Sequence, residues 1–285
     1  MDPFDQLLSV AWLREHLHDE NLRIFDATYH LPGSGREAAS EFFARHIAHA
    51  AFFDIDGVAD PNTTLPHMLP DAEAFARAVE SMGMRNDSLA VVYDAHGLMS
   101  AARLWWMFRV FGHDRVAVLD GGLPAWIASG GSIESGPSRV PPAPPGSFTA
   151  HLQRPLLANQ EEVLAASTDG SALVLDARSE ARFHAKAPEP RAGVRPGHIP
   201  GSENLPYTEL IGEGSLFREP AELSEIFARA GVAPGRRVIT LCGSGVTACV
   251  LALGLARLGR DDVAVYDGSW SEWGADPSSP VAPMP

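Results

Sequence analysis

A cysteine at the start of a glycine-containing loop is the residue of this chain best suited to act as a nucleophile. Cys242 opens the run Cys242–Ala248 (CGSGVTA) directly after the apolar stretch Val238–Leu241, and a helical pattern follows over residues 248–258. Glycines let the backbone curl so that several amide N–H groups point inward, and a helix N-terminus adds about half a positive charge at the same place. Such surroundings favour the thiolate, which is the nucleophilic form of cysteine.

Each of these residues also has a purely structural interpretation. A free cysteine is usually a small buried hydrophobe, and we expect that role for Cys249, which lies inside the predicted helix. The loop makes the same role a weaker alternative for Cys242. Ser244 lies in the loop beside the sulfur, where its hydroxyl would cap the N-terminus of the helix.

The chain contains two copies of one strand–loop–helix arrangement. The runs Val116–Gly122 (VAVLDGG) and Val263–Ser269 (VAVYDGS) align at an offset of 147 residues, and the same offset carries Cys242 onto Ala95. Alanine has no reactive atom. We therefore predict that the first copy is catalytically silent and that the second copy does the chemistry.

Short apolar runs alternate with amphipathic helices in both copies, which indicates an α/β fold with buried parallel strands. The helix faces are marked by Phe75, Ala76, Val79 and Met82 in the first copy and by Leu223, Ile226, Phe227 and Ala230 in the second. We predict two tandem domains over residues 5–130 and 155–280, each a mostly parallel sheet flanked by helices. A linker rich in proline, glycine and serine joins them over 131–154. Ligands of such sheets bind at the carboxyl ends of the strands, where Cys242 lies.

Composition restricts the class of function. The 285 residues are 45% hydrophobic, and the net charge of −14 argues against nucleic acid as a partner. No run approaches the roughly 18 apolar residues that would span a membrane, and residues 1–6 show no signal peptide. Two cysteines without a CxxC motif suit a reducing compartment, so we expect a cytoplasmic protein. Neither a clustered ligand set nor a dinucleotide fingerprint is present, so we expect no metal and no organic cofactor.

Several motifs together resemble the tandem rhodanese-type sulfurtransferases over nearly the whole chain. They are Cys242–Ala248, Arg195–Gly201 (RPGHIPG), Asp267–Trp273 (DGSWSEW), Phe52–Asp56 and His67–Pro70. The resemblance implies two rhodanese-like domains and the transfer of sulfur from 3-mercaptopyruvate to a thiophilic acceptor through a persulfide on Cys242, with release of pyruvate. A thiol, thioredoxin or cyanide would serve as the acceptor.

The resemblance also implies a relay in which Asp56 orients His67, and His67 polarises Ser244 beside the substrate. Without it, His67 is an ordinary loop histidine and Asp56 a solvated carboxylate. The backbone amides of the loop would bind the sulfur, and substrate contacts are expected at Gly243, Gly245, Val246 and Thr247.

Two arginines match the substrate-binding arginines of that family. Arg182 and Arg191 would hold the carboxylate of a 2-keto acid with planar paired donors, although alone each is a solvated surface charge. His184 stands where some relatives carry a further arginine. Asp176 and Arg178 are expected to form a structural pair at the strand end instead.

Two alternatives remain at this stage, a thiosulfate sulfurtransferase and a persulfide carrier or redox-sensing module, whereas the loop argues against a phosphatase. Thiosulfate-using relatives carry Arg and Lys after the cysteine, whereas this chain has the neutral Gly243 and Ser244, which favours mercaptopyruvate over thiosulfate. A persulfide carrier or redox-sensing binding module would use Cys242 but would leave the arginines without a task. Cysteine phosphatases use a longer loop that ends in Arg, whereas this loop ends in Ala248.

Overall fold

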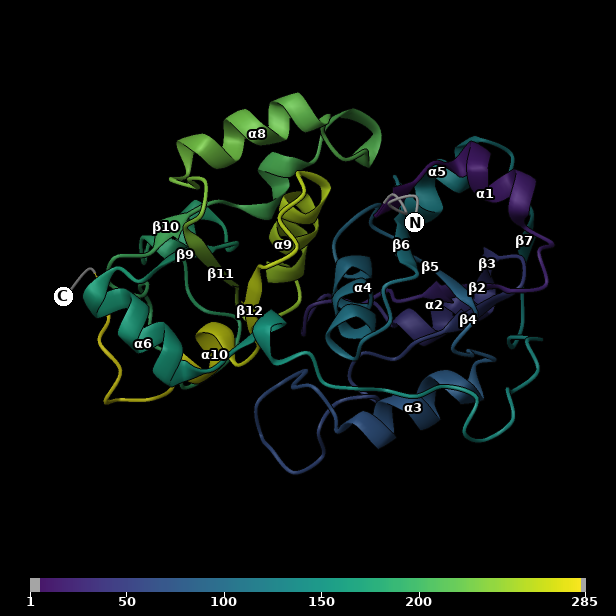
Figure 1. Cartoon of the computed structure of the whole chain (residues 1–285), viewed down its shortest axis with the longest axis horizontal. Coiled ribbons are helices and arrows are strands. Elements are labelled where there is room, and N and C mark those ends of the chain that lie inside the picture. The colour runs from purple at the N-terminus through teal and green to yellow at the C-terminus, as the bar shows by residue number, and fades with distance from the viewer. Residues whose placement is uncertain (1–5, 283–285) are drawn as a thin grey trace. The chain divides into compact units, whose positions relative to one another are not determined.

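The structure, a computed structural model, describes residues 6–282 and divides into two compact units (Figure 1). Unit 1 holds residues 6–60, 69–153 and 212–217, and unit 2 holds residues 61–68, 154–211 and 218–282. Residues 1–5, which include the start of the predicted first domain and most of the segment searched for a signal peptide, lie outside the described range. Among residues 6–282, none of the helices is long and apolar enough to cross a membrane.

Both units are built on a five-stranded parallel sheet, as the sequence predicts. In unit 1 the order is β1-β6-β5-β2-β4, formed by Leu7–Leu8, Val116–Leu119, Leu89–Tyr93, Leu22–Asp26 and Ala50–Phe52. In unit 2 the order is β8-β12-β11-β9-β10, formed by Leu157–Ala158, Ala264–Tyr266, Arg237–Leu241, Ala172–Asp176 and Glu203–Asn204. The two orders correspond strand for strand, which confirms the duplication.

Helices cover both faces of each sheet. Unit 1 contains α1 (Val10–His16), α2 (Ala38–Ala44), α3 (Ala72–Ser81), α4 (Ala101–Val110) and α5 (Gly122–Ala128), with an antiparallel pair β3 (His46–Ile47) and β7 (Ile133–Glu134). Unit 2 contains α6 (Gln160–Asp169), α7 (Glu180–Phe183), α8 (Pro220–Arg229), α9 (Ala248–Arg257) and α10 (Ser269–Trp273). Short 3₁₀ turns are η1 (Arg154–Leu156), η2 (Tyr207–Leu210) and η3 (Glu213–Ser215). In unit 2, α8 and α9 lie on one side of the strands and α6 and α10 on the other (Figure 1).

The predicted amphipathic faces become core. Phe75 and Val79 of α3 are fully buried, and so is Leu223 of α8. In unit 2 a cluster of buried hydrophobic side chains packs α6 and α10 against the strands, and Trp270 and Trp273 in this cluster are 0% exposed. Burial of such large side chains on both faces is the main stabilising contribution of a doubly covered sheet.

The strand registers correct the residue that corresponds to Cys242. Asp26 of β2 pairs with Tyr93, and Asp176 of β9 pairs with Leu241, so the residue after each partner is Asp94 in unit 1 and Cys242 in unit 2. Hydrogen bonds agree, because the α5 and α10 residues Leu123 and Trp270 donate to the carbonyls of Asp94 and Cys242, both at 3.0 Å.

The gap-free offset that put Ala95 at this position is therefore wrong by one residue here. The physical reason is loop length. Seven residues, 94–100, separate β5 from α4, whereas six residues, 242–247, separate β11 from α9. An alignment without gaps cannot absorb the additional residue. The first copy still has no thiol at this place, but it has a carboxylate rather than a methyl group.

Candidate active site

Cys242 lies where β11 ends and is 2% exposed. Its amide donates to the hydroxyl of Ser269 at 3.1 Å, and that hydroxyl donates in turn to the carbonyl of Tyr266 at 2.7 Å. The N-terminus of α10 thus fixes the backbone from which the sulfur projects. Cys249 is fully buried in α9, as expected for a small hydrophobic residue, and its Sγ lies 3.2 Å from the carbonyl of Gly245.

The α10 segment also holds the carbonyl side of the active loop. Trp270 N donates to Cys242 O at 3.0 Å, and Ser271 donates to Gly243 O through its amide at 2.9 Å and its hydroxyl at 2.6 Å. Within residues 6–282, the amides of four loop residues make no hydrogen bond: Gly243, Ser244, Val246 and Thr247. Because the carbonyls of Cys242 and Gly243 already accept hydrogen bonds, the loop can offer a ligand its backbone N–H donors.

The loop that follows β5 in unit 1 shows how this type of loop binds a carboxylate. One Asp94 carboxylate oxygen accepts the amide of His96, and the other accepts three more amides, all at 2.8 Å, from Met99, Ser100 and Ala101. Asp94 is itself fully buried. The loop after β5 is therefore an anion site filled by its own side chain, and Cys242 begins the corresponding loop in unit 2.

Ser269 adopts an unusual backbone conformation in order to make its contact. Its φ is +49°, in the left-handed region that disfavours residues with a Cβ. The corresponding residue in unit 1 is Gly122, with φ of +52°. A Cβ on Gly122 would lie 2.5 Å from Asp94 O, so glycine is required there. In unit 2 the backbone of Ser269 is strained, and the Ser269 hydroxyl accepts the hydrogen bond from the Cys242 amide.

Arg182 lies against the active loop. A Cβ built on Gly243 would lie 2.9 Å from Arg182 Nη2, so the glycine leaves room for the guanidinium. Glu189 accepts from Arg182 at 2.5 Å and from Arg178 at 2.8 Å, and its side chain is only 4% exposed. Because the Arg182 side chain is 20% exposed, part of the guanidinium still faces solvent beside the loop.

Asp176 and Arg178 form the predicted structural pair. Arg178 Nη2 lies 2.6 Å from an Asp176 carboxylate oxygen, and the guanidinium carbon lies 4.3 Å from the ring centroid of Trp270. Burial opposes the charge of Arg178, but Asp176 and then Glu189 more than offset that cost, so the Arg178 pKa is raised. The cation is enclosed by two carboxylates and an aromatic face, and its role is to support α10.

Arg191 and His67 meet within unit 2. Arg191 Nη2 lies 3.1 Å from His67 Nε2, and His67 is buried with φ of +63°. Since arginine can only donate, His67 Nε2 is the acceptor, which assigns the proton of a neutral ring to Nδ1. The segment 61–68 belongs to the first half of the sequence, yet it groups with unit 2.

The remaining predicted residues are only partly placed. Ser244 is buried, at 5% exposure, in the loop beside Cys242. His184 ends α7 as an exposed residue with its ring edge-on to Phe183 at 5.0 Å. Asp56 belongs to unit 1, so its relation to His67 and Ser244 stays a prediction.

Sequence reasoning missed two residues of this site. Glu189 carries no spacing signal, although an acid between two arginines of one loop is a hint of pairing. Ser269 carried a stronger signal, because it replaces Gly122 within an otherwise matching run. When one copy has glycine at a position and the other has serine, the serine side chain is expected to have a function that outweighs the backbone strain.

The role of Ser269 can be tested through stability. Ser269→Ala should lower the free energy of unfolding by about 1–3 kcal/mol, since the buried Cys242 amide loses its acceptor. Ser269→Gly loses the same acceptor but relieves the positive φ, so it should be more stable than Ser269→Ala by about 1 kcal/mol. Urea denaturation measures both, with Ser224→Ala at an exposed position of α8 as control. Equal stability of Ser269→Ala and the wild type would contradict the proposed contact.

Comparison with known proteins agrees with this geometry. The model of the rhodanese-like domain matches twice, at residues 9–129 and 159–276. The chain is 44% identical to the 3-mercaptopyruvate sulfurtransferase of Escherichia coli K12, over 97% of this chain and 98% of that protein. It is 41% identical to the mitochondrial thiosulfate/3-mercaptopyruvate sulfurtransferase 1 of Arabidopsis thaliana, over 97% of this chain and 78% of that protein.

A solved structure supports the same assignment. The crystal structure of SseA from Escherichia coli, described as a 3-mercaptopyruvate sulfotransferase with the rhodanese fold, superposes with a TM-score of 0.84 at 41% identity, covering 94% of this chain and 99% of that one. Two matched domains, full-length relatives and a shared fold lead to one conclusion: the chain belongs to the rhodanese family, as a tandem-domain member.

Proposed function

We propose that this chain is a sulfurtransferase that moves sulfur from 3-mercaptopyruvate to a thiophilic acceptor through a persulfide on Cys242. The observation that carries the mechanism is the anion site of the duplicated loop. In unit 1 the Asp94 carboxylate accepts hydrogen bonds from four backbone amides. In the loop that starts at Cys242, several amides have no hydrogen-bond partner among the described residues. A thiolate or persulfide anion at Cys242 supplies the charge that such a loop stabilises.

The reaction takes place in two displacements. The Cys242 thiolate attacks the sulfur of the donor, the new S–S bond forms, and the C–S bond breaks with its electron pair moving to carbon. The organic fragment leaves as the enolate of pyruvate and takes up a proton. In the second step a thiol, thioredoxin or cyanide attacks the outer sulfur of the persulfide and regenerates the Cys242 thiolate.

Arg182 supports recognition of the substrate carboxylate. Its guanidinium lies against Gly243 and is partly exposed, while Glu189 fixes its orientation. Arg191 is the second candidate, and it would exchange its contact with His67 for the substrate. Release of His67 Nε2 on substrate binding would then make this nitrogen available to Ser244 in the predicted relay with Asp56.

The surroundings of Gly243 also favour mercaptopyruvate over thiosulfate. An arginine at position 243 would direct its Cβ to within 2.9 Å of the Arg182 guanidinium, so a cationic loop and the present position of Arg182 conflict. The relatives named above include one whose name gives both donors, so identity over the whole chain does not separate them. The buried thiols Cys242 and Cys249 suit a reducing compartment such as the cytoplasm.

Pyruvate release tests the function directly. Purified protein should release pyruvate from 3-mercaptopyruvate when a thiol acceptor is present. A persulfide carrier would accept sulfur from another protein and release no pyruvate. Thiosulfate turnover without any pyruvate release from 3-mercaptopyruvate would instead identify a thiosulfate sulfurtransferase.

Cysteine variants identify the nucleophile. Cys242→Ser should abolish turnover, and Cys249→Ser should keep most of it. Both cysteines lie between Arg237 and Arg257 and fall in one tryptic peptide, so intact mass is the better readout. After treatment with donor alone, Cys249→Ser should gain one sulfur atom and Cys242→Ser none. The opposite pattern would refute the assignment.

A carboxylate at position 242 tests the anion site itself. Cys242→Asp should be inactive yet more stable than Cys242→Ser, by about 1.5–3 kcal/mol if its carboxylate takes the loop amides, the typical contribution of hydrogen bonds to a charged group. Urea denaturation compares the two inactive variants. An Asp variant less stable than the Ser variant would show that this loop does not receive a negative charge.

Arginine variants test substrate recognition. Arg182→Ala should lower kcat/KM for 3-mercaptopyruvate by about tenfold to several thousandfold, as expected when a buried charge pair loses one partner. Arg182→Lys should restore only part of the lost kcat/KM, because lysine cannot form paired hydrogen bonds to a carboxylate. The exposed Arg77→Gln serves as control. Unchanged kinetics for Arg182→Ala would exclude the residue from binding.

The relay is testable by a double-mutant cycle. Ser244→Ala and His67→Ala should each lower pyruvate release by roughly 10²–10⁴-fold, as positioned acid–base groups do. The double variant should be little worse than either, because members of one relay are not additive. Multiplicative losses would show that Ser244 and His67 act separately.

A further inference from the structure

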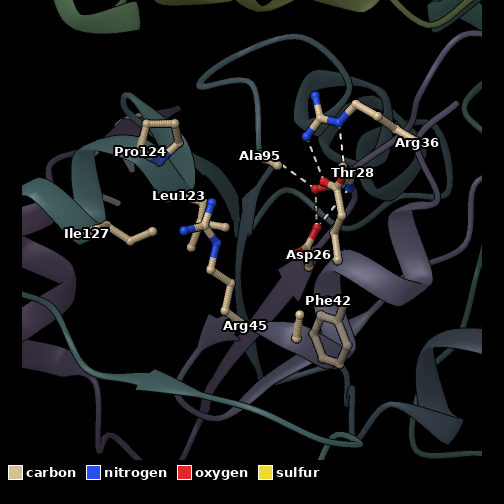
Figure 2. A pocket seen from close by; sticks show the side chains of 11 residues that line it. Asp26, Thr28, Arg36, Phe42, Arg45, Ala95, Leu123, Pro124 and Ile127 are labelled. Carbon is tan, nitrogen blue, oxygen red and sulfur yellow. Dashed lines mark hydrogen bonds and ion pairs between the residues drawn. The ribbon is translucent and has the colours of Figure 1, made fainter. Parts of the chain in front are cut away.

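Unit 1 contains a cavity of about 470 Å³ beside the loop that follows β5 (Figure 2). Phe42, Leu123, Pro124 and Ile127 provide an apolar wall, and Asp26 lies at the strand end that borders it. A cavity of this size with apolar walls and a few polar groups is typical of a site for a small molecule. It lies at the carboxyl ends of the parallel strands, where such sheets bind ligands.

The cavity exists because two large side chains of unit 2 have small counterparts in unit 1. Thr28 corresponds to Arg178, since each donates its amide at 2.9 Å to the aspartate that ends its strand. Leu123 corresponds to Trp270, as their matching hydrogen bonds show. Where Arg178 and Trp270 stack at 4.3 Å in unit 2, threonine and leucine leave the space open in unit 1.

Asp26 has consequently lost the cation that its counterpart keeps. Asp176 pairs with Arg178 at 2.6 Å, whereas the Asp26 carboxylate accepts hydrogen bonds from two neutral groups, the amide and the hydroxyl of Thr28, at 2.9 and 2.5 Å. Burial, opposed by hydrogen bonds from Thr28 and Tyr93 and reinforced by nearby Asp94, raises the pKa of Asp26 to about 6. A buried carboxylate in this condition is stabilised by any cation that reaches it.

The opposite charge in the cavity is Arg45. Its side chain extends from the end of α2 toward the cavity (Figure 2), and among residues 6–282 its guanidinium has no hydrogen bond or ion pair. The other charged groups at the rim neutralise each other, because Arg36 binds both carboxylate oxygens of Glu41 at 2.7 Å. One acidic group and one basic group are thus left to a ligand.

We propose that this cavity binds a free α-amino acid with an apolar side chain. The ammonium group takes the place that Arg178 has in unit 2 and pairs with Asp26. The carboxylate pairs with Arg45, whose guanidinium matches it in charge and shape. The side chain packs on the wall formed by Phe42, Leu123 and Ile127. A zwitterion balances the charges of the cavity, whereas a simple anion or cation leaves one of the two groups unpaired.

Isothermal titration calorimetry with three matched probes tests the proposal. L-leucine carries both charges, 4-methylpentanoate lacks the ammonium group, and 3-methylbutylamine lacks the carboxylate. Leucine should bind at least about tenfold more tightly than either analogue, since each lost charged hydrogen bond costs 1.5 kcal/mol or more. Equal affinity of leucine and either analogue, or no binding of leucine, would overturn the proposal.

Variants place the ligand in this cavity. Thr28→Arg with Leu123→Trp rebuilds the pair present in unit 2, fills the space and should abolish leucine binding. Arg45→Gln should weaken leucine binding by about tenfold or more while leaving 3-methylbutylamine unaffected. Arg77→Gln, which removes an exposed arginine elsewhere in unit 1, should change nothing. Undiminished leucine binding in Arg45→Gln would exclude this cavity as the site, even if the double variant fails to fold.

Discussion

A loop that presents backbone amides needs a negative charge to receive them, and both copies of this fold are organised around that requirement. In unit 1 the charge is built in, because the Asp94 carboxylate accepts four amides at 2.8 Å. In unit 2 the corresponding residue is Cys242, whose side chain carries a sulfur in place of a carboxylate. In the proposed mechanism the two copies therefore differ in one respect: unit 1 carries a carboxylate at this position, and unit 2 carries a sulfur that becomes an anion during the reaction.

The elements around Cys242 follow from the same requirement. Helix α10 holds the loop carbonyls, which leaves the amide side of the loop for a ligand, and Ser269 accepts an unfavourable φ to fix the Cys242 amide. The buried Arg178 pairs with Asp176 and packs against the ring of Trp270, which supports α10. Strain and buried charge are concentrated within a few residues of the sulfur, as is common where a structure has to position a reactive group.

Much of this could be predicted from the sequence, because a duplication supplies its own comparison. Strand periodicity and the paired VAVLDGG and VAVYDGS runs predicted the two domains and their parallel sheets, whereas the choice of Cys242 as nucleophile stays a prediction. The counterpart of Cys242 was wrong by one residue, since an insertion inside a loop leaves no trace in strand patterns. Glu189 could not be identified, because its pairing with Arg178 and Arg182 depends on how an irregular segment folds back. The grouping of 61–68 with unit 2 is likewise a property of long-range packing, which local patterns do not contain.

The central claim is that the loop of Cys242 stabilises a sulfur anion through its amides. A crystal structure of the protein after treatment with 3-mercaptopyruvate, in the absence of an acceptor, tests it most directly. We predict density for one additional sulfur on Cys242, with several amides from residues 243–248 directed at it, as amides 96 and 99–101 are directed at Asp94. An additional sulfur that points away from these amides, or that is attached to Cys249, would contradict the claim.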